Sequence, residues 1–92
     1  MPTINPELLT YSDKYYDDTY EFRHVVVPAR EIRRIPGENK LFSENEWRNL
    51  GIQQSVGWEH YENFQGSYQH MMFRRKLVKV EEEKKNETKN EI

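Results

Sequence analysis

Residues 43–61 read S-E-N-E-W-R-N-L-G-I-Q-Q-S-V-G-W-E-H-Y, and they contain the clearest structural signals of the chain. Ser43 and Glu46 form a capping box, in which the serine hydroxyl accepts a hydrogen bond from the amide three residues on and the glutamate reaches back to the serine amide. The helix that they open ends at Gly51, because glycine readily adopts the left-handed conformation of a helix stop. Residues 56–61 follow at once and are predicted to form a strand. A short helix therefore leads directly into a strand.

Three more strands and a second helix surround this block. Residues 20–27 are aromatic and β-branched and end at Pro28, which also suits the start of a helix. The expected elements are strands over 11–16, 20–27, 56–61 and 70–75, a helix over 29–35 and the helix opened at Ser43. This order predicts an α+β protein with a four-stranded antiparallel sheet and two short helices inserted between the second and third strands.

The chain is organised around one small domain. Its 92 residues fit a single domain. Residues 1–10 contain Pro2 and Pro6 and are expected to be a flexible arm, and residues 11–80 are expected to be the domain. Residues 81–92 consist of Glu, Lys, Asn and Thr with one Ile, a composition that cannot bury enough apolar surface to fold. We expect this last stretch to be a disordered charged tail.

The composition argues against several classes of function. The net charge of −2 is unlike the basic excess of a general nucleic-acid binder. No apolar run approaches the ~20 residues that cross a membrane. The absence of cysteine excludes disulfides and favours a reducing compartment, the cytosol or the nucleus. The 3 histidines lack the spacing of a metalloprotease, and no glycine-rich nucleotide-binding loop is present. We therefore expect no enzyme activity, no metal and no cofactor.

The arginines on the predicted strands have two interpretations. Arg23 lies on one strand, and Arg74 and Arg75 follow an apolar run on another. In the first interpretation they form ion pairs with glutamates of neighbouring strands, such as Glu21 and Glu59. In the second they line a pocket for phosphate, because a planar guanidinium can donate two parallel hydrogen bonds to two phosphate oxygens. Periodicity alone leaves both interpretations open.

Four stretches together resemble the cyclin-dependent kinase regulatory subunit (Cks) family. They are Y-S-D-K-Y at 11–15, Y-E-F-R-H-V at 20–25, the block 43–61 and F-R-R at 73–75. The block is long and unusual, and the resemblance extends over roughly residues 11–77. It implies a four-stranded antiparallel sheet capped by short helices, in agreement with the fold expected from the residues themselves.

The resemblance also implies a function. Cks proteins are non-catalytic adaptors of the cell cycle that bind a cyclin-dependent kinase and tether targets containing phosphothreonine followed by proline, which promotes multisite phosphorylation. On this resemblance the phosphate-binding residues are Lys14, Arg23, Ser55, Trp58 and Arg75. The three cations would neutralise the phosphate, while the serine and the tryptophan would donate neutral hydrogen bonds. Two other functions stay open: a phosphopeptide-binding module with a different partner, and a small nucleic-acid-binding protein.

One loop departs from the family pattern. Where Cks proteins have H-x-P-E-P-H, residues 64–69 read F-Q-G-S-Y-Q. In the family this loop contacts the kinase and is the hinge for exchanging the last strand between two chains. The loss of both prolines and the turn that Gly66 allows predict mainly a closed monomer. The expected kinase contacts are Tyr61, Phe64, Tyr68 and Met72. The alternative for Tyr61 and Met72 is burial in the core.

Overall fold

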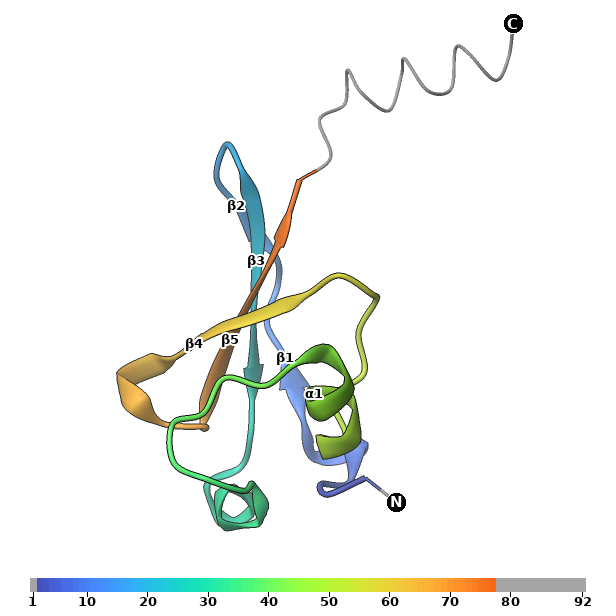
Figure 1. Ribbon diagram of the computed structural model, residues 1–92, viewed down its shortest axis with the longest axis vertical. Coiled ribbons are helices and arrows are strands. Elements are labelled where there is room, and N and C mark those ends of the chain that lie inside the picture. The colour runs from blue at the N-terminus through green and yellow to red at the C-terminus, as the bar shows by residue number, and fades with distance from the viewer. Residues whose placement is uncertain (1, 78–92) are drawn as a thin grey trace, which may run out of the picture.

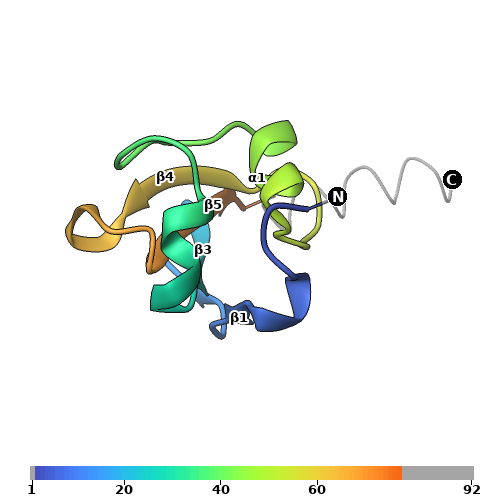
Figure 2. The ribbon, with the colours of Figure 1, turned by 90° about the horizontal axis from the view of Figure 1, so that it is seen from below.

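The computed structural model describes residues 2–77, so the tail expected at 81–92 lies outside the described residues. The strands are β1 (Thr10–Tyr11), β2 (Tyr15–Tyr16), β3 (Tyr20–Val26), β4 (Glu59–Asn63) and β5 (His70–Lys76). The helices are α1 (Glu44–Leu50) and the 3-10 helices η1 (Pro6–Leu8), η2 (Ala29–Arg34) and η3 (Phe64–Gly66). Seen from below, η2, α1 and the N-terminal segment lie around the lower end of the sheet (Figure 2).

The sheet is antiparallel, with the strand order β1-β3-β5-β4, and β2 also pairs with β3. The two long strands β3 and β5 lie side by side over their whole lengths, from Tyr20 opposite Lys76 to Val26 opposite His70 (Figure 1). Strands β1 and β2 are two parts of the expected first strand, and η2 and α1 come between β3 and β4. The structure therefore confirms the α+β class and the position of the helices, with the first strand split in two.

Local signals place most of the element boundaries. The Ser43 hydroxyl accepts a hydrogen bond from the Glu46 amide at 3.3 Å, and the Glu46 carboxylate accepts one from the Ser43 amide at 2.8 Å, so the capping box is present. The helix expected at 29–35 is a short 3-10 helix. Strand β4 begins at Glu59, later than expected, because Gly57 turns the chain with a φ of 96°.

One face of the sheet carries the hydrophobic core. Alternate residues of β3 and β5 point to this face, among them Val25, Met71 and Phe73, each 0% exposed. Helix α1 packs on them with the buried side chains of Trp47 and Leu50. The rings of Trp47 and Phe73 meet edge to face with their centroids 5.6 Å apart. The core is therefore a single cluster between the sheet and the segments that cover it.

The structure corrects the expectation of a flexible arm at residues 1–10. Ile4 is 1% exposed and packs in the core. The amides of Thr3 and Ile4 donate to the last carbonyls of α1 at 3.1 and 2.8 Å, and these carbonyls have no partner within the helix. Gly51 permits the approach, because a Cβ atom at this position would lie 2.3 Å from the Ile4 carbonyl oxygen. The described part of the segment is thus held by main-chain hydrogen bonds and one buried side chain.

A buried polar network ties β4 to the loop before α1. The His60 Nδ1 atom accepts a hydrogen bond from the Phe42 amide at 2.9 Å, so the ring hydrogen must be on Nε2. This Nε2 lies 2.6 Å from the Asn63 Oδ1 atom and donates to it. The Asn63 amide group then donates to Asn39 Oδ1 and to the Lys40 carbonyl at 3.0 and 2.9 Å. The network needs a neutral imidazole, and burial lowers the pKa of His60.

We predict that stability falls as the pH drops below 6.5, the ordinary pKa of histidine. Because burial holds the pKa of His60 below that value, the unfolded chain takes up the proton first, and the folded state loses relative stability as the pH falls. The carboxylates of Asp17, Glu44 and Glu46 contribute little in this range, since hydrogen bonds hold their pKa values below the ordinary values and keep them ionised.

Urea unfolding at a series of pH values from about 7.5 to about 5.5 measures this loss, and NMR titration of the His60 ring protons measures its pKa directly. His24 contributes in the same direction, because burial and the nearby His70 lower its pKa as well. The variant His24→Gln separates the contributions of the two histidines to the pH dependence, since it removes that of His24 and keeps that of His60. A His60 pKa at or above the ordinary value would contradict the prediction.

Candidate functional site

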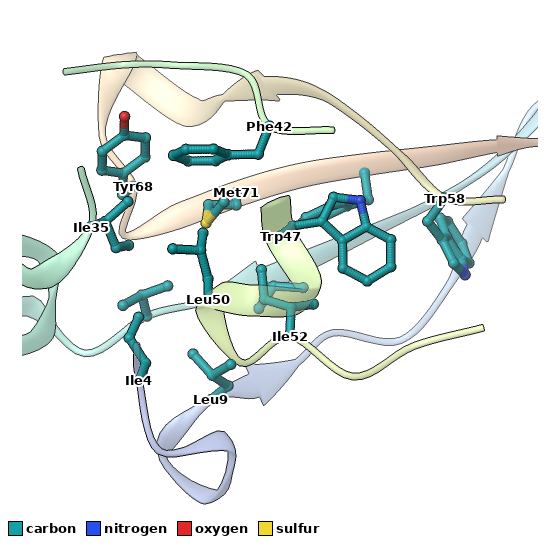
Figure 3. Close-up of a cluster of buried hydrophobic side chains, with 13 residues drawn as sticks. Ile4, Leu9, Ile35, Phe42, Trp47, Leu50, Ile52, Trp58, Tyr68 and Met71 are labelled. Carbon is teal, nitrogen blue, oxygen red and sulfur yellow. The ribbon is translucent and has the colours of Figure 1, made fainter. Parts of the chain in front are cut away.

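Three cationic side chains gather around the indole ring of Trp58. Trp58 is 2% exposed and lies at one end of the buried cluster, with Tyr68 near the other end (Figure 3). The Lys14 Nζ atom lies 5.9 Å, the Arg23 Cζ atom 5.6 Å and the Arg75 Cζ atom 4.8 Å from the ring centroid. These distances allow cation–π attraction. The fold therefore brings the three predicted cations and the predicted tryptophan together.

A β-bulge in the edge strand brings Lys14 to this place. Tyr11 pairs with Val25 and Tyr15 pairs with Phe22. Three residues of the edge strand, 12–14, therefore lie opposite two residues of β3, 23–24. Ser12 continues the pairing across the gap: its amide donates to the His24 carbonyl at 2.9 Å, and its hydroxyl accepts from the His24 amide at 2.8 Å. Bulges redirect side chains. The split between β1 and β2 is thus the feature that positions Lys14.

Ser55 connects two members of the cluster. Its hydroxyl oxygen accepts hydrogen bonds from Arg75 Nη1 at 2.7 Å and from Trp58 Nε1 at 3.2 Å. The indole N–H, which the resemblance assigns to the ligand, donates to the serine in this structure. A hydroxyl that accepts two hydrogen bonds still has its own O–H to donate. Ser55 therefore keeps one hydroxyl hydrogen that it can donate.

Glu21 also belongs to this site, although the resemblance does not assign it. It faces Arg75 across the two central strands, and its Oε2 atom accepts a hydrogen bond from Arg75 Nε at 2.6 Å. Its Oε1 atom lies 3.9 Å from Lys14 Nζ. A usable signal was present in the sequence, since Glu21 and Arg23 are two residues apart on one strand and so share a face. Arg75 thus forms an ion pair and also lines the cluster.

Two polar side chains at or beside the cluster have unmet hydrogen-bonding capacity. Among the described residues, the Arg23 Nε atom and both amide atoms of Gln54 are buried without a hydrogen-bond partner. The Arg23 guanidinium lies between two rings, 5.7 Å from Tyr11 and 5.6 Å from Trp58. Gln54 directly precedes Ser55, and the resemblance does not assign it to the site. Buried polar groups without partners are uncommon and need an explanation.

The outer face of the sheet carries partly exposed aromatic and methionine side chains. Tyr61 is the extra residue at an irregularity of the β4–β5 pairing, and its ring lies 6.0 Å from that of Phe22. Phe64 is 47% exposed, with its ring 6.1 Å from that of His70. Tyr61 and Met72 are half-buried and lie outside the core cluster. These three predicted kinase contacts are therefore accessible on one side of the molecule.

Tyr68 is an exception, and its prediction as an exposed kinase contact is wrong. It is 5% exposed, and its ring lies 5.6 Å from that of Phe42 in the core. The hydroxyl accepts a hydrogen bond from the Lys40 amide at 2.8 Å and donates to the Pro36 carbonyl at 3.3 Å. A tyrosine buries well where its hydroxyl finds such partners. Those partners come from a distant loop, so the residues near position 68 did not reveal them.

Neither a membrane-spanning helix nor a metal-binding cluster is found in the part of the chain that the structure describes. Across residues 2–77, every helix is too short or too polar to cross a bilayer. Over the same range, histidine, aspartate and glutamate side chains do not gather in groups of three or more that could hold a metal ion.

Comparison with known proteins gives a consistent result. The family model described as cyclin-dependent kinase regulatory subunit matches residues 9–77. A cyclin-dependent kinases regulatory subunit 2 of Arabidopsis thaliana is 49% identical over 69 residues, which cover 75% of this chain and 82% of the relative. A probable regulatory subunit of Physarum polycephalum is 46% identical over 71 residues, which cover 77% and 83%. One from Patella vulgata is 46% identical over 68 residues, which cover 74% and 88%.

Proposed function

The chain belongs to the cyclin-dependent kinase regulatory subunit family, and on that basis we propose that it is a non-catalytic adaptor with two binding surfaces. One surface binds a cyclin-dependent kinase. The other, formed by Lys14, Arg23, Ser55 and Arg75 around Trp58, binds phosphothreonine followed by proline in protein targets. An adaptor that holds a phosphorylated target next to a kinase promotes phosphorylation of further sites on that target, because it raises their effective concentration.

The observation that carries this proposal is the arrangement of three cations around one buried indole ring. Like charges repel, and Glu21 offsets only one of the three positive charges that lie 4.8 to 5.9 Å from the ring centroid, so a bound anion would relieve the remaining repulsion. Arginine binds phosphate oxygens in pairs through its planar fork, and two of the cations are arginines. The free O–H of Ser55 adds a neutral donor. Each of these features suits a phosphate group.

The balance of charge also favours a phosphate. Lys14, Arg23 and Arg75 bring three positive charges and Glu21 brings one negative charge, which leaves a net charge of about +2. Phosphothreonine carries about −1.5 to −2 near neutral pH. A bound phosphate therefore removes most of the excess charge, and phosphate binding stabilises the folded domain by mass action.

Isothermal calorimetry tests the phosphate site. A phosphothreonine–proline peptide should bind, and the same peptide without phosphate should bind weakly or not at all. Arg75→Ala should weaken binding by about 1.5–3 kcal/mol, the range for a hydrogen bond to a charged group. Arg74→Ala is the matched control and should leave the affinity nearly unchanged, because this guanidinium lies 4.6 Å from the Tyr20 ring on the outer face of the sheet. Equal affinity for the two peptides would contradict the assignment.

We place kinase docking on the outer face of the sheet. Tyr61, Phe64 and Met72 are exposed or half-exposed there, and aromatic and methionine side chains are enriched at protein interfaces. Tyr68 is left out of this surface because it is part of the core. The docking surface and the cation cluster involve opposite faces of the same sheet, so one adaptor can hold a kinase and a target together.

Phe64→Ala should weaken kinase binding by at least about 1 kcal/mol, as expected for an interface anchor, without lowering the melting temperature. Surface plasmon resonance with an immobilised cyclin-dependent kinase measures the affinity, and calorimetry measures the stability. Val56→Ala is the control, since Val56 is 73% exposed and apolar but lies beside the cation cluster. A stable Phe64→Ala variant that binds the kinase normally removes this loop from the interface and favours a module with a different partner.

The hinge loop supports a mainly monomeric state. Gln65 and Gly66 have φ angles of 54° and 72°, and the Ser67 amide donates to the Phe64 carbonyl at 3.1 Å, which closes a tight reversal. An exchanged strand needs the loop to run straight, and these left-handed conformations favour the closed form instead. The loop also lacks proline, whose fixed φ favours extended backbone.

Size exclusion with light scattering should therefore show a monomer from about 1 to about 500 μM. Gly66→Pro should shift the protein toward a dimer, because proline cannot adopt the positive φ of this position. Gly66→Asn is the control and should stay monomeric, since asparagine tolerates the left-handed conformation. A dominant dimer of the unaltered protein at micromolar concentration, with β5 exchanged between chains, would contradict the expectation.

A further inference from the structure

A buried carboxylate lies among the cations of the phosphate site. The Glu21 side chain is 11% exposed, and the short 2.6 Å contact joins its Oε2 atom to the Nε atom of Arg75. Its other oxygen lies 3.9 Å from Lys14 Nζ. A negative charge beside an anion site repels the ligand, so charge alone makes Glu21 unfavourable for phosphate binding. A carboxylate at this position therefore needs a further effect on phosphate binding that offsets the repulsion.

That further effect is the orientation of Arg75. The guanidinium has five N–H donors in a rigid fork, and Glu21 accepts from one of them. The Nη1 atom donates to Ser55 Oγ at 2.7 Å and to the Val56 carbonyl at 3.3 Å, and the Trp58 ring lies 4.8 Å from Cζ. Within residues 2–77, the Nη2 atom makes no hydrogen bond. Of the three guanidinium nitrogens, Nε and Nη1 are thus held by the described residues, and Nη2 is left open.

The neighbouring arginine provides a comparison inside the same strand. Arg74 also donates through Nε to a glutamate, Glu59, at 2.8 Å. The Glu59 side chain is 59% exposed, however, whereas that of Glu21 is 11% exposed. An exposed pair of this kind contributes little, while a buried carboxylate has a desolvation cost that stability alone rarely offsets. The two pairs have similar geometry, but only the buried one lies in the cation cluster.

We infer that Glu21 is a positioning residue of the phosphate site, which holds the Arg75 guanidinium so that its free Nη2 group is available to the ligand. The inference rests on the proposed phosphopeptide function. Glu21 does not touch the phosphate; it acts through Arg75, and the gain in orientation outweighs the repulsion between the carboxylate and the ligand. Removal of Glu21 should therefore weaken phosphate binding, whereas charge alone predicts that it strengthens binding.

Calorimetry with a phosphothreonine–proline peptide compares Glu21→Ala and Glu21→Gln with the unaltered protein. Glu21→Ala should bind about tenfold more weakly, which corresponds to about 1.4 kcal/mol. Glu21→Gln should bind more tightly than Glu21→Ala, because the glutamine carbonyl oxygen still accepts from Arg75 Nε while the charge is gone. The matched control, Glu59→Ala, removes the same charge from an exposed pair and should bind normally. Tighter binding by both Glu21 variants would mean that Glu21 is a competing counter-ion, and would overturn the inference.

A double-mutant cycle shows whether Glu21 acts through Arg75. In an Arg75→Lys background the guanidinium is absent, so Glu21→Ala should no longer weaken binding and should strengthen it instead. An equal loss in both backgrounds would overturn the inference. The double-mutant cycle uses only variants whose melting temperatures show that they are folded. If Glu21→Ala unfolds, Glu21→Gln takes its place in the cycle.

One further readout does not depend on the peptide. The Arg75 Nε–H signal in NMR should be protected from solvent exchange in the unaltered protein and in Glu21→Gln, and lost in Glu21→Ala. If the unaltered protein fails to bind the peptide, the proposed function is wrong, and this signal still tests the orientation of Arg75. If the unaltered protein binds and the signal is unchanged in Glu21→Ala, the positioning role alone is overturned.

Discussion

The indole ring of Trp58 is packed into the hydrophobic core, and the charges of Lys14, Arg23 and Arg75 lie 4.8 to 5.9 Å from its centroid. The same ring therefore belongs both to the core that holds the fold together and to the proposed phosphate site. Its N–H also fixes Ser55 by a hydrogen bond. Because the core fixes the ring, the cations have a rigid support, and rigid support is what a binding site needs in order to keep its geometry.

The parts of the structure that could be predicted from the sequence are those that depend on neighbouring residues. The capping box of α1 needs only Ser43 and Glu46, and the apolar, β-branched character of β3 is visible in a single stretch. The residues of the cation cluster were assigned by resemblance. Physical reasoning alone left the arginines undecided, because the place of Lys14 depends on a bulge, and a bulge depends on the pairing register of two strands.

The parts that could not be predicted depend on partners far along the chain. Ile4 is buried because its backbone meets the end of α1, and that approach needs Gly51. Tyr68 is buried because its hydroxyl reaches the loop before α1. Glu21 meets Arg75 through the register of β3 and β5. In each case the sequence shows a residue suited to the contact, while the contact itself comes from the tertiary structure.

The central place of β5 has a consequence for the order in which the chain folds. Strand β5 lies between β3 and β4, although it follows both in the sequence, and it pairs residue 20 with residue 76. Among the described residues, strand β4 pairs only with β5, and β3 without β5 pairs only with the short strands β1 and β2. A ribbon of two short strands is marginally stable in water. We therefore expect the sheet to form in one cooperative step once β5 is available, with the slower kinetics typical of contacts between residues distant along the chain.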